Sequence, residues 1–405
     1  MDSNKSTLVR LSVGTFVMSL FIFYPIYQVV YFQGIHFSLF QIGIIGAIIS
    51  LFGLLAEIPT GLYADIFGRK RSTILGYCIA TSGFLGIYLS NNFYIICLFS
   101  ALIGIGAAFI SGALQAWMTN LFGMKKLAKS FAVMQSVGSL GLLFSGFLGV
   151  FVVKNYGLGS IWFAAFIGYV LVIILFLTIK DSKSYVQKKK LRRVSSRDYL
   201  KNFQDSLRYI SKKPSLKYFL VAMFFMGFAL AFTQALVWIP FFEGIGYPTD
   251  SLGILWSLMA AAAFLGPLIG LRLSRYFSSV NYFIITIFLW IISLWIFVGI
   301  NSIYPAILIL FLTVLFDQMR YPVERAFLQG LFTEKTRATL GSIESMVVSI
   351  AGIIGLPIAG LVADAITPRY TLVLSGILLL PVIFFLYKIK SLKINNLKKG
   401  RTGLM

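Results

Sequence analysis

Residues 40–71 read FQIGIIGAIISLFGLLAEIPTGLYADIFGRKR. Residues 40–63 hold a single charged side chain, Glu57, and the run ends shortly before the consecutive basic residues Arg69, Lys70 and Arg71. A helix needs about 20 predominantly apolar residues to cross the hydrocarbon core of a bilayer, and basic residues collect in the loops on the cytoplasmic side. This stretch therefore predicts a transmembrane helix that ends at the cytoplasmic face.

Similar apolar runs recur along the whole chain. Of its 405 residues 59% are hydrophobic and 12% are charged, with a mean hydropathy of +0.89, values unlike those of soluble proteins. The first run exceeds the apolar region of a signal peptide and no small-residue cleavage site follows it, so we expect it to be retained. Backbone polar groups in lipid must bond to one another, which favours helices. We expect twelve spans, at residues 8–32, 40–63, 73–89, 94–118, 131–153, 161–179, 218–241, 252–271, 282–298, 305–326, 340–362 and 370–387.

The predicted fold is an all-α integral membrane protein with twelve transmembrane helices in two pseudo-symmetric six-helix bundles. The expected parts are an N-terminal bundle at residues 1–180, a basic cytoplasmic linker with a short amphipathic helix at 181–214, and a C-terminal bundle with a basic tail at 215–405. A shift of 209 residues superimposes Gly61 on Gly270 and Gln115 on Glu324. Such parallel repeats are typical of transporters with a central site between two halves.

The formal charge of +22 is explained by topology, because the basic residues gather in the even-numbered loops and the linker. We therefore expect a multi-pass protein of the cell membrane with both termini in the cytoplasm, and no nucleic-acid partner. Cys78 and Cys97 lie inside spans and His36 is the single histidine, so we expect no metal and no cofactor. The spans hold no clustered catalytic residues and the chain has no phosphate-binding Gly-x-x-x-x-Gly-Lys pattern, so we expect no enzyme and no ATP hydrolysis.

The loop after the second span carries a spaced set of residues, Gly61, Asp65, Gly68 and Arg69. Gly61 would let helices approach closely, Gly68 permits a tight turn, and Asp65 offers a carboxylate to a helix N-terminus or an arginine. This segment resembles the signature of the major facilitator superfamily, in the same loop. The resemblance implies a secondary transporter in which these four residues act as a gate latch, with Asp65 and Arg69 stabilising one closed state.

Two further segments, EIPTG at 57–61 and RAT at 337–339, resemble multidrug-exporter-like members of that family. Two positions depart from family patterns. Ser100 stands where proton-driven members carry an arginine, and Gly146 replaces the proline of the antiporter pattern in the fifth span.

Charged residues inside spans are costly and usually face a cavity or a partner. Asp317, Arg320 and Glu324 are spaced to share one helical face, where one carboxylate can take a proton while the arginine satisfies the other. An internal structural salt bridge is the alternative. Glu344 and Glu57 are single carboxylates that would bind substrate or protons or act in gating, and Glu57 precedes Pro59, which can bend the helix. We predict that these five residues couple transport to protons.

Tyr24, Tyr27 and Gln28 form a polar aromatic stripe in the first span, and Gln234 and Trp238 lie in the seventh. Facing the interior, they would line a cavity that stacks flat or cationic organic molecules. Gln115 is a further predicted substrate residue, which, like Gln234, would suit hydroxyl-rich ligands. The alternative is an aromatic belt at the membrane interface.

We therefore predict a monomeric transporter that works by alternating access and exports hydrophobic or cationic small molecules with protons as the coupling ion. Uptake or facilitated diffusion of a polar nutrient such as a sugar, amino acid or nucleoside is the alternative. A non-transporting sensor or lipid carrier is a third reading.

Overall fold

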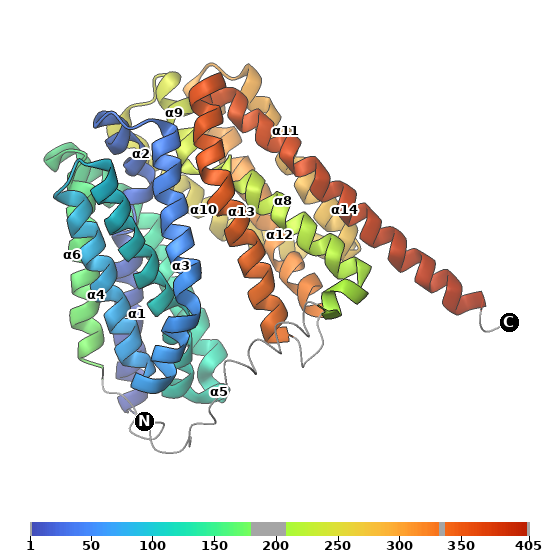
Figure 1. Cartoon of the computed structure of the whole chain (residues 1–405), viewed down its shortest axis with the longest axis horizontal. Helices are drawn as coiled ribbons and strands as arrows, with labels where there is room; N and C mark the ends of the chain where they lie inside the picture. Colours follow the sequence, from blue (N-terminus) through green and yellow to red (C-terminus); the bar gives the residue numbers. More distant parts are fainter. Residues whose placement is uncertain (1, 180–207, 332–336, 403–405) are drawn as a thin grey trace. The chain divides into compact units, whose positions relative to one another are not determined.

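A computed structural model describes residues 2–179, 208–331 and 337–402, and in these ranges the chain forms helices and short connections without a strand (Figure 1). The all-α membrane fold predicted from the apolar runs is confirmed. The amphipathic helix expected in the linker falls largely on residues 180–207, outside the described residues.

Eleven stretches of the described helices are long and apolar enough to cross a membrane. The predicted third span is not one of them, although it forms helix α4 (Arg69–Tyr88), whose 20 residues extend about 30 Å. The reason lies in its composition, because α4 starts with three basic residues and is rich in glycine, serine and threonine. Ser72 and Thr73 are nonetheless fully buried, so their hydroxyl groups are sheltered inside the bundle.

The described helices fall into two compact units. The first unit comprises residues 2–179 together with Ile239–Ala261 and Leu356–Asp364. Its main helices are α1 (Asp2–Leu20), α2 (Tyr24–Gly34), α3 (Leu39–Phe67), α4, α5 (Phe93–Tyr156) and α6 (Ser160–Leu177). Helices α1, α3 and α4 pack against α5. The interior of this unit is aromatic, with exposed fractions of 2% or less for Tyr77, Phe84, Trp162 and Phe176.

The second unit comprises the remaining described residues, 208–238, Ala262–Gly355 and 365–402. Its core gathers large apolar side chains from several helices, among them Phe219, Trp290, Leu340 and Leu379. The helices of the second half of the chain are α8 (Pro214–Ala231), α9 (Ala235–Gly244), α10 (Leu252–Leu273), α11 (Ser279–Ile296), α12 (Ile303–Leu331), α13 (Arg337–Ile366) and α14 (Pro368–Thr402). Parts of α9, α10 and α13 thus belong to the first unit, and the bundle boundaries expected from the sequence stay a prediction.

Two predicted spans are interrupted and two are joined. The first span breaks at residues 21–23, because Pro25 lacks an N–H and its ring opposes the carbonyl four positions earlier. The seventh breaks at 232–234, close to the equivalent position under the 209-residue shift. The loop expected between the fourth and fifth spans is helical, so α5 runs through 64 residues. Residues 121–129 contain no proline and several strong helix formers, which explains the continuous helix.

Candidate functional site

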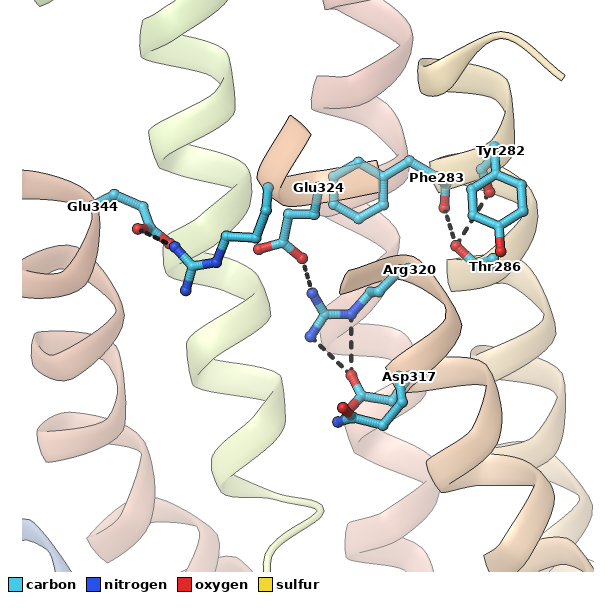
Figure 2. Close-up of polar contacts among 9 residues, drawn as sticks. Tyr282, Phe283, Thr286, Asp317, Arg320, Glu324 and Glu344 are labelled. Atoms are coloured by element: carbon cyan, nitrogen blue, oxygen red, sulfur yellow. Dashed lines mark hydrogen bonds and ion pairs between the residues drawn. The ribbon is translucent and has the colours of Figure 1, made fainter. Parts of the chain in front are cut away.

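The strongest concentration of buried charge lies on α12, where Asp317, Arg320 and Glu324 share one face as their spacing predicts (Figure 2). The Arg320 guanidinium donates from Nε at 3.0 Å and from Nη2 at 2.8 Å to Oδ1 of Asp317. Its Nη1 donates to Oε2 of Glu324. Arg320 is 7% and Glu324 5% exposed, so the three charges are held by one another inside the unit rather than by water.

Neighbouring helices fix the backbone of α12 at this point. Pro322 lies inside the helix, and its missing N–H leaves the carbonyl of Gln318 without its helical donor. The hydroxyl of Tyr282 on α11 donates to the carbonyl of Met319 at 3.1 Å. A Cβ added at Gly270 on α10 would lie 2.2 Å from the same carbonyl oxygen, so α10 packs directly against the α12 backbone. The charged face therefore lies on a segment of α12 whose backbone is held in place by α10 and α11.

A second ion pair joins α12 to α13. Arg325 donates from Nη1 to Oε2 of Glu344 at 3.2 Å, and its guanidinium carbon lies 5.1 Å from the ring centre of Tyr321. The two partners differ in their surroundings, because the side chain of Glu344 is 5% exposed whereas that of Arg325 is 45% exposed. Glu324 is close enough to act electrostatically on both.

These residues form one chain of charges, Asp317–Arg320–Glu324 followed by Arg325–Glu344 (Figure 2). Three carboxylates face two guanidinium groups, so the group carries one net negative charge when all are ionised. Such a surplus inside a membrane protein can be balanced by a proton or by a cationic ligand. The predicted triad is therefore part of a five-residue cluster in which Glu344 also takes part.

The aromatic stripe of the first span lies inside the first unit. Tyr24 packs against Phe84 and Trp162, with ring centres 5.0 and 5.5 Å away. Tyr27 is fully buried, donates from its hydroxyl to the Asp250 carbonyl at 2.9 Å and accepts from the Gly253 N–H at 2.9 Å. Both rings thus contribute to packing in this structure, and their role in substrate binding stays a prediction.

The other predicted substrate residues lie in different surroundings. Gln28 is half-buried on α2, Gln115 is exposed on α5, and Gln234 is exposed between α8 and α9. Trp238 on α9 is 2% exposed. The amides of Gln115 and Gln234 are exposed, each within its own unit, and the role of these four residues in substrate binding stays a prediction.

In the signature loop, Gly68 forms the turn between two helices and Arg69 ties one of them to α5. Gly68 joins α3 to α4 with φ of +102°, a conformation that favours glycine. Arg69 donates from Nη1 to the carbonyl of Ala116 at 2.9 Å and to Oδ1 of Asn120 at 3.1 Å, which ties the start of α4 to α5. The role of these residues as a gate latch stays a prediction.

The remaining predicted residues of α3 are exposed. Glu57, Gly61 and Asp65 all present open surface. The close helix approach expected at Gly61 is not made among the described residues, because a Cβ there would meet nothing within 4 Å. Its repeat equivalent, Gly270, makes such an approach in the second unit.

Sequence reasoning missed Tyr282 and Trp290 on α11, which contact the charged part of α12. The guanidinium carbon of Arg320 lies 5.6 Å from the ring centre of Trp290. The signal was present as two large aromatic side chains spaced eight residues apart, with Thr286 midway, which places the three on one helical face. Spacing alone did not reveal which helix that face meets.

A sequence model of the Major Facilitator Superfamily matches residues 11–281 and 250–403 of the chain. Among relatives, an uncharacterized MFS-type transporter, YxaM of Bacillus subtilis (strain 168), is 24% identical over 93% of this chain and 94% of its own length. Multidrug resistance protein 1 of the same organism is 21% identical over 82% of both chains.

Solved structures of transporters have a similar fold. The nucleoside transporter NupG superposes with a TM-score of 0.78 at 13% identity, over 95% of this chain and 98% of the other. A bacterial homologue of the human lysosomal transporter Spinster, in an inward-facing and unoccupied conformation, gives a TM-score of 0.73 at 16% identity, over 96% and 97%. At these identities the likeness concerns the fold alone.

Proposed function

We propose that this chain, which belongs to the Major Facilitator Superfamily and is a secondary membrane transporter, exports hydrophobic or cationic small molecules in exchange for protons. The buried charge cluster of α12 and α13 carries this proposal. Three carboxylates share two guanidinium groups there, and one negative charge is left to be balanced. A proton on one cluster carboxylate in one state, and a cation nearby in another, gives a simple basis for exchange.

The transport cycle is alternating access, with the six-helix bundles at residues 1–180 and 215–405 moving about a central substrate site. We place both termini in the cytoplasm of a monomer in the cell membrane, because the basic residues gather in the loops on that side. Tyr24, Tyr27, Gln28, Gln115, Gln234 and Trp238 are the proposed substrate residues, and Gly61, Asp65, Gly68 and Arg69 the proposed gate.

One distant relative supports export. The chain is similar to multidrug resistance protein 1 of Bacillus subtilis over most of its length. Aromatic rings such as those proposed to bind the substrate attract flat cations through their faces. A deprotonated cluster would favour the cationic substrate, and a protonated cluster would favour its release. Exchange then follows from competition between two positive species for the same surplus charge.

The test uses the purified full-length chain in liposomes, with ethidium as a flat, permanently cationic probe. The liposome lumen is made acidic, so that protons flow outward down their gradient. In exchange for these protons, the transporter should carry ethidium into the lumen. Glu344→Gln should reduce accumulation to the level of liposomes without protein, because it removes the surplus negative charge. Asp250→Asn is the matched control, since Asp250 pairs with Lys154 at 3.6 Å where both side chains are about half exposed. Proton exchange is contradicted if ethidium accumulation does not depend on the proton gradient, or if it is unchanged in Glu344→Gln.

Uptake of a polar nutrient is the second candidate function. The exposed amides of Gln115 and Gln234 favour it, because amide groups donate and accept hydrogen bonds to hydroxyl-rich ligands. Uridine and glucose are the probes. Their accumulation in the same liposomes, in the absence of ethidium transport, would support uptake over export.

A further inference from the structure

Trp290 lies on α11 behind the charged face of α12. It is 1% exposed, and the guanidinium carbon of Arg320 lies 5.6 Å from the centre of its ring. The α11 residues Tyr282, Thr286 and Trp290 are four apart and share a face, and Tyr282 donates to the α12 backbone at Met319. Helix α11 therefore contacts α12 through the Tyr282 hydroxyl, which bonds the backbone next to Arg320, and through the Trp290 ring, which lies beside the Arg320 guanidinium.

Apolar packing alone does not explain a tryptophan here. Its indole N–H is buried and has no hydrogen-bond partner among the described residues. A buried donor without a partner is unfavourable, whereas phenylalanine or leucine would bury an apolar side chain without that donor. The indole ring is also the aromatic side chain that attracts a cation most strongly through its face. The contact with Arg320 gives a reason for this side chain that filling of the core does not.

Arg320 is held on three sides. Asp317 accepts two of its N–H groups and Glu324 accepts another, so the carboxylates occupy the edges of the guanidinium. Trp290 adds a contact from α11. A planar guanidinium with bonded edges and an aromatic ring beside it has little freedom to rotate.

Arg325 is held much less firmly. Its hydrogen bond to Glu344 is 3.2 Å long, and its aromatic neighbour Tyr321 is itself 46% exposed. The side chain of Arg325 is 45% exposed, so water competes for its charge, while Glu344 is buried and feels the nearby negative charge of Glu324. Of the three cluster carboxylates, Glu344 therefore has the weakest positive partner.

We propose that Trp290 is a positioning residue that fixes Arg320 between Asp317 and Glu324, which leaves Glu344 as the carboxylate that binds and releases the coupled proton. This rests on the proposed proton exchange and deepens it. Among the described residues, the charged groups that act on Glu344 are Arg325 and Glu324 of α12, and the titratable group that α11 brings to this part of α12 is Tyr282, bonded to the backbone.

The experiment measures which carboxylates hold a proton, without needing the substrate. Dicyclohexylcarbodiimide, an apolar reagent that reacts with protonated carboxyl groups, is applied to the full chain in detergent across a pH series, and labelled peptides are resolved by mass spectrometry. In the unmodified protein we expect Glu344 to be labelled first as the pH falls, with Asp317 and Glu324 protected.

Trp290→Leu removes the ring and should raise labelling of Asp317 and Glu324 about fivefold, the factor that corresponds to a cation–π contact of about 1 kcal/mol. Trp290→Phe keeps a weaker aromatic face and should give an intermediate rise in the labelling of Asp317 and Glu324. Trp117→Leu is the matched control, since Trp117 is fully buried against Phe176 in the first unit. It should lower stability without changing the labelling pattern.

If the labelling of Asp317 and of Glu324 is the same in both Trp290 variants as in the unmodified protein, Trp290 contributes to core packing only and does not position Arg320. Labelling of Asp317 or Glu324 ahead of Glu344 in the unmodified protein would overturn the proton assignment. The expected labelling pattern in a protein that transports nothing under a pH gradient would leave the positioning role of Trp290 and the order of protonation standing. It would remove the proposed function, and with it the coupling role of Glu344.

Discussion

The backbone N–H of Phe40 donates a hydrogen bond of 2.9 Å to the carboxylate of Asp364, 324 positions further along the chain. The neighbouring N–H of Leu39 donates to the other carboxylate oxygen at 3.1 Å, while Ser38 caps the N–H of Gln41. These N–H groups belong to the first turn of α3, which has no helical acceptors for them. The C-terminal part of α13 thus completes the N-cap of α3 within the first unit.

We predict that Asp364→Ala lowers the free energy of unfolding by about 1–2 kcal/mol, because two donors at a positive helix end lose a charged acceptor. Asp364→Asn retains one carbonyl oxygen and should lose about half as much. Thermal unfolding in detergent measures both variants. Equal stability of Asp364→Ala and the unmodified chain would show that water or lipid headgroups replace this cap without loss.

Glycine contacts in the same unit give a second prediction. A Cβ added at Gly146 on α5 would lie 1.9 Å from the carbonyl oxygen of Gly253 on α10. Small residues let helix backbones approach this closely in membranes. Gly146→Ala should therefore lower stability by about 1–3 kcal/mol, as overpacking does.

The matched control for Gly146 is Gly112, on the same helix, where an added Cβ meets nothing within 4 Å. Gly112→Ala should leave stability unchanged or raise it, because alanine is the better helix former. Detergent melting curves and yields of the two variants are compared side by side. If both variants melt alike, the α5–α10 contact is looser than the structure indicates.

The sequence was informative where a relation lies within one helix. The face shared by Asp317, Arg320 and Glu324 follows from their spacing, and the turn at Gly68 follows from a glycine between an apolar run and a basic start. Relations between helices were not predictable in this way. Nothing in the spacing of Asp364 points to Phe40, because the contact depends on how α13 packs beside α3.

The same limit applied to the candidate site. Arg325 directly follows Glu324, yet it was not singled out, because its partner Glu344 lies on another helix. Trp290 read as one more apolar residue of an apolar span, and only its position beside Arg320 gives it another role. The surroundings of Tyr27 were the least predictable, since spacing within α2 does not show that its hydroxyl bonds backbone groups near the start of α10. Its role in substrate binding stays a prediction.

The signature loop gives a third prediction. Gly68 has φ of +102° and ψ of 144°, a region that side chains with a Cβ avoid. Gly68→Ala should lower stability by about 1–3 kcal/mol through backbone strain. Gly61→Ala is the control on the preceding helix, where a Cβ meets open space and stability should hold. If Gly61→Ala keeps its melting temperature and loses transport, the loss supports the gate proposed for this segment rather than a folding defect.

Removal of Arg320 gives the sharpest test of the charge cluster. Arg320→Met leaves Asp317 and Glu324 buried without their shared cation, so the free energy of unfolding should fall by about 3–5 kcal/mol. The triple variant Asp317→Asn, Arg320→Met, Glu324→Gln removes all three charges together and should recover most of this loss, because a neutral buried set has no unpaired ion.

Arg272→Met is the control for Arg320, because Arg272 is an exposed arginine in the last turn of α10 and its loss should change stability little. The measurements are thermal unfolding and gradient-driven ethidium transport on each variant. A stable triple variant without transport indicates that the cluster serves the transport cycle more than the fold. A triple variant that stays as unstable as Arg320→Met would instead mean that the three side chains hold α12 in place through packing that neutral substitutes cannot reproduce.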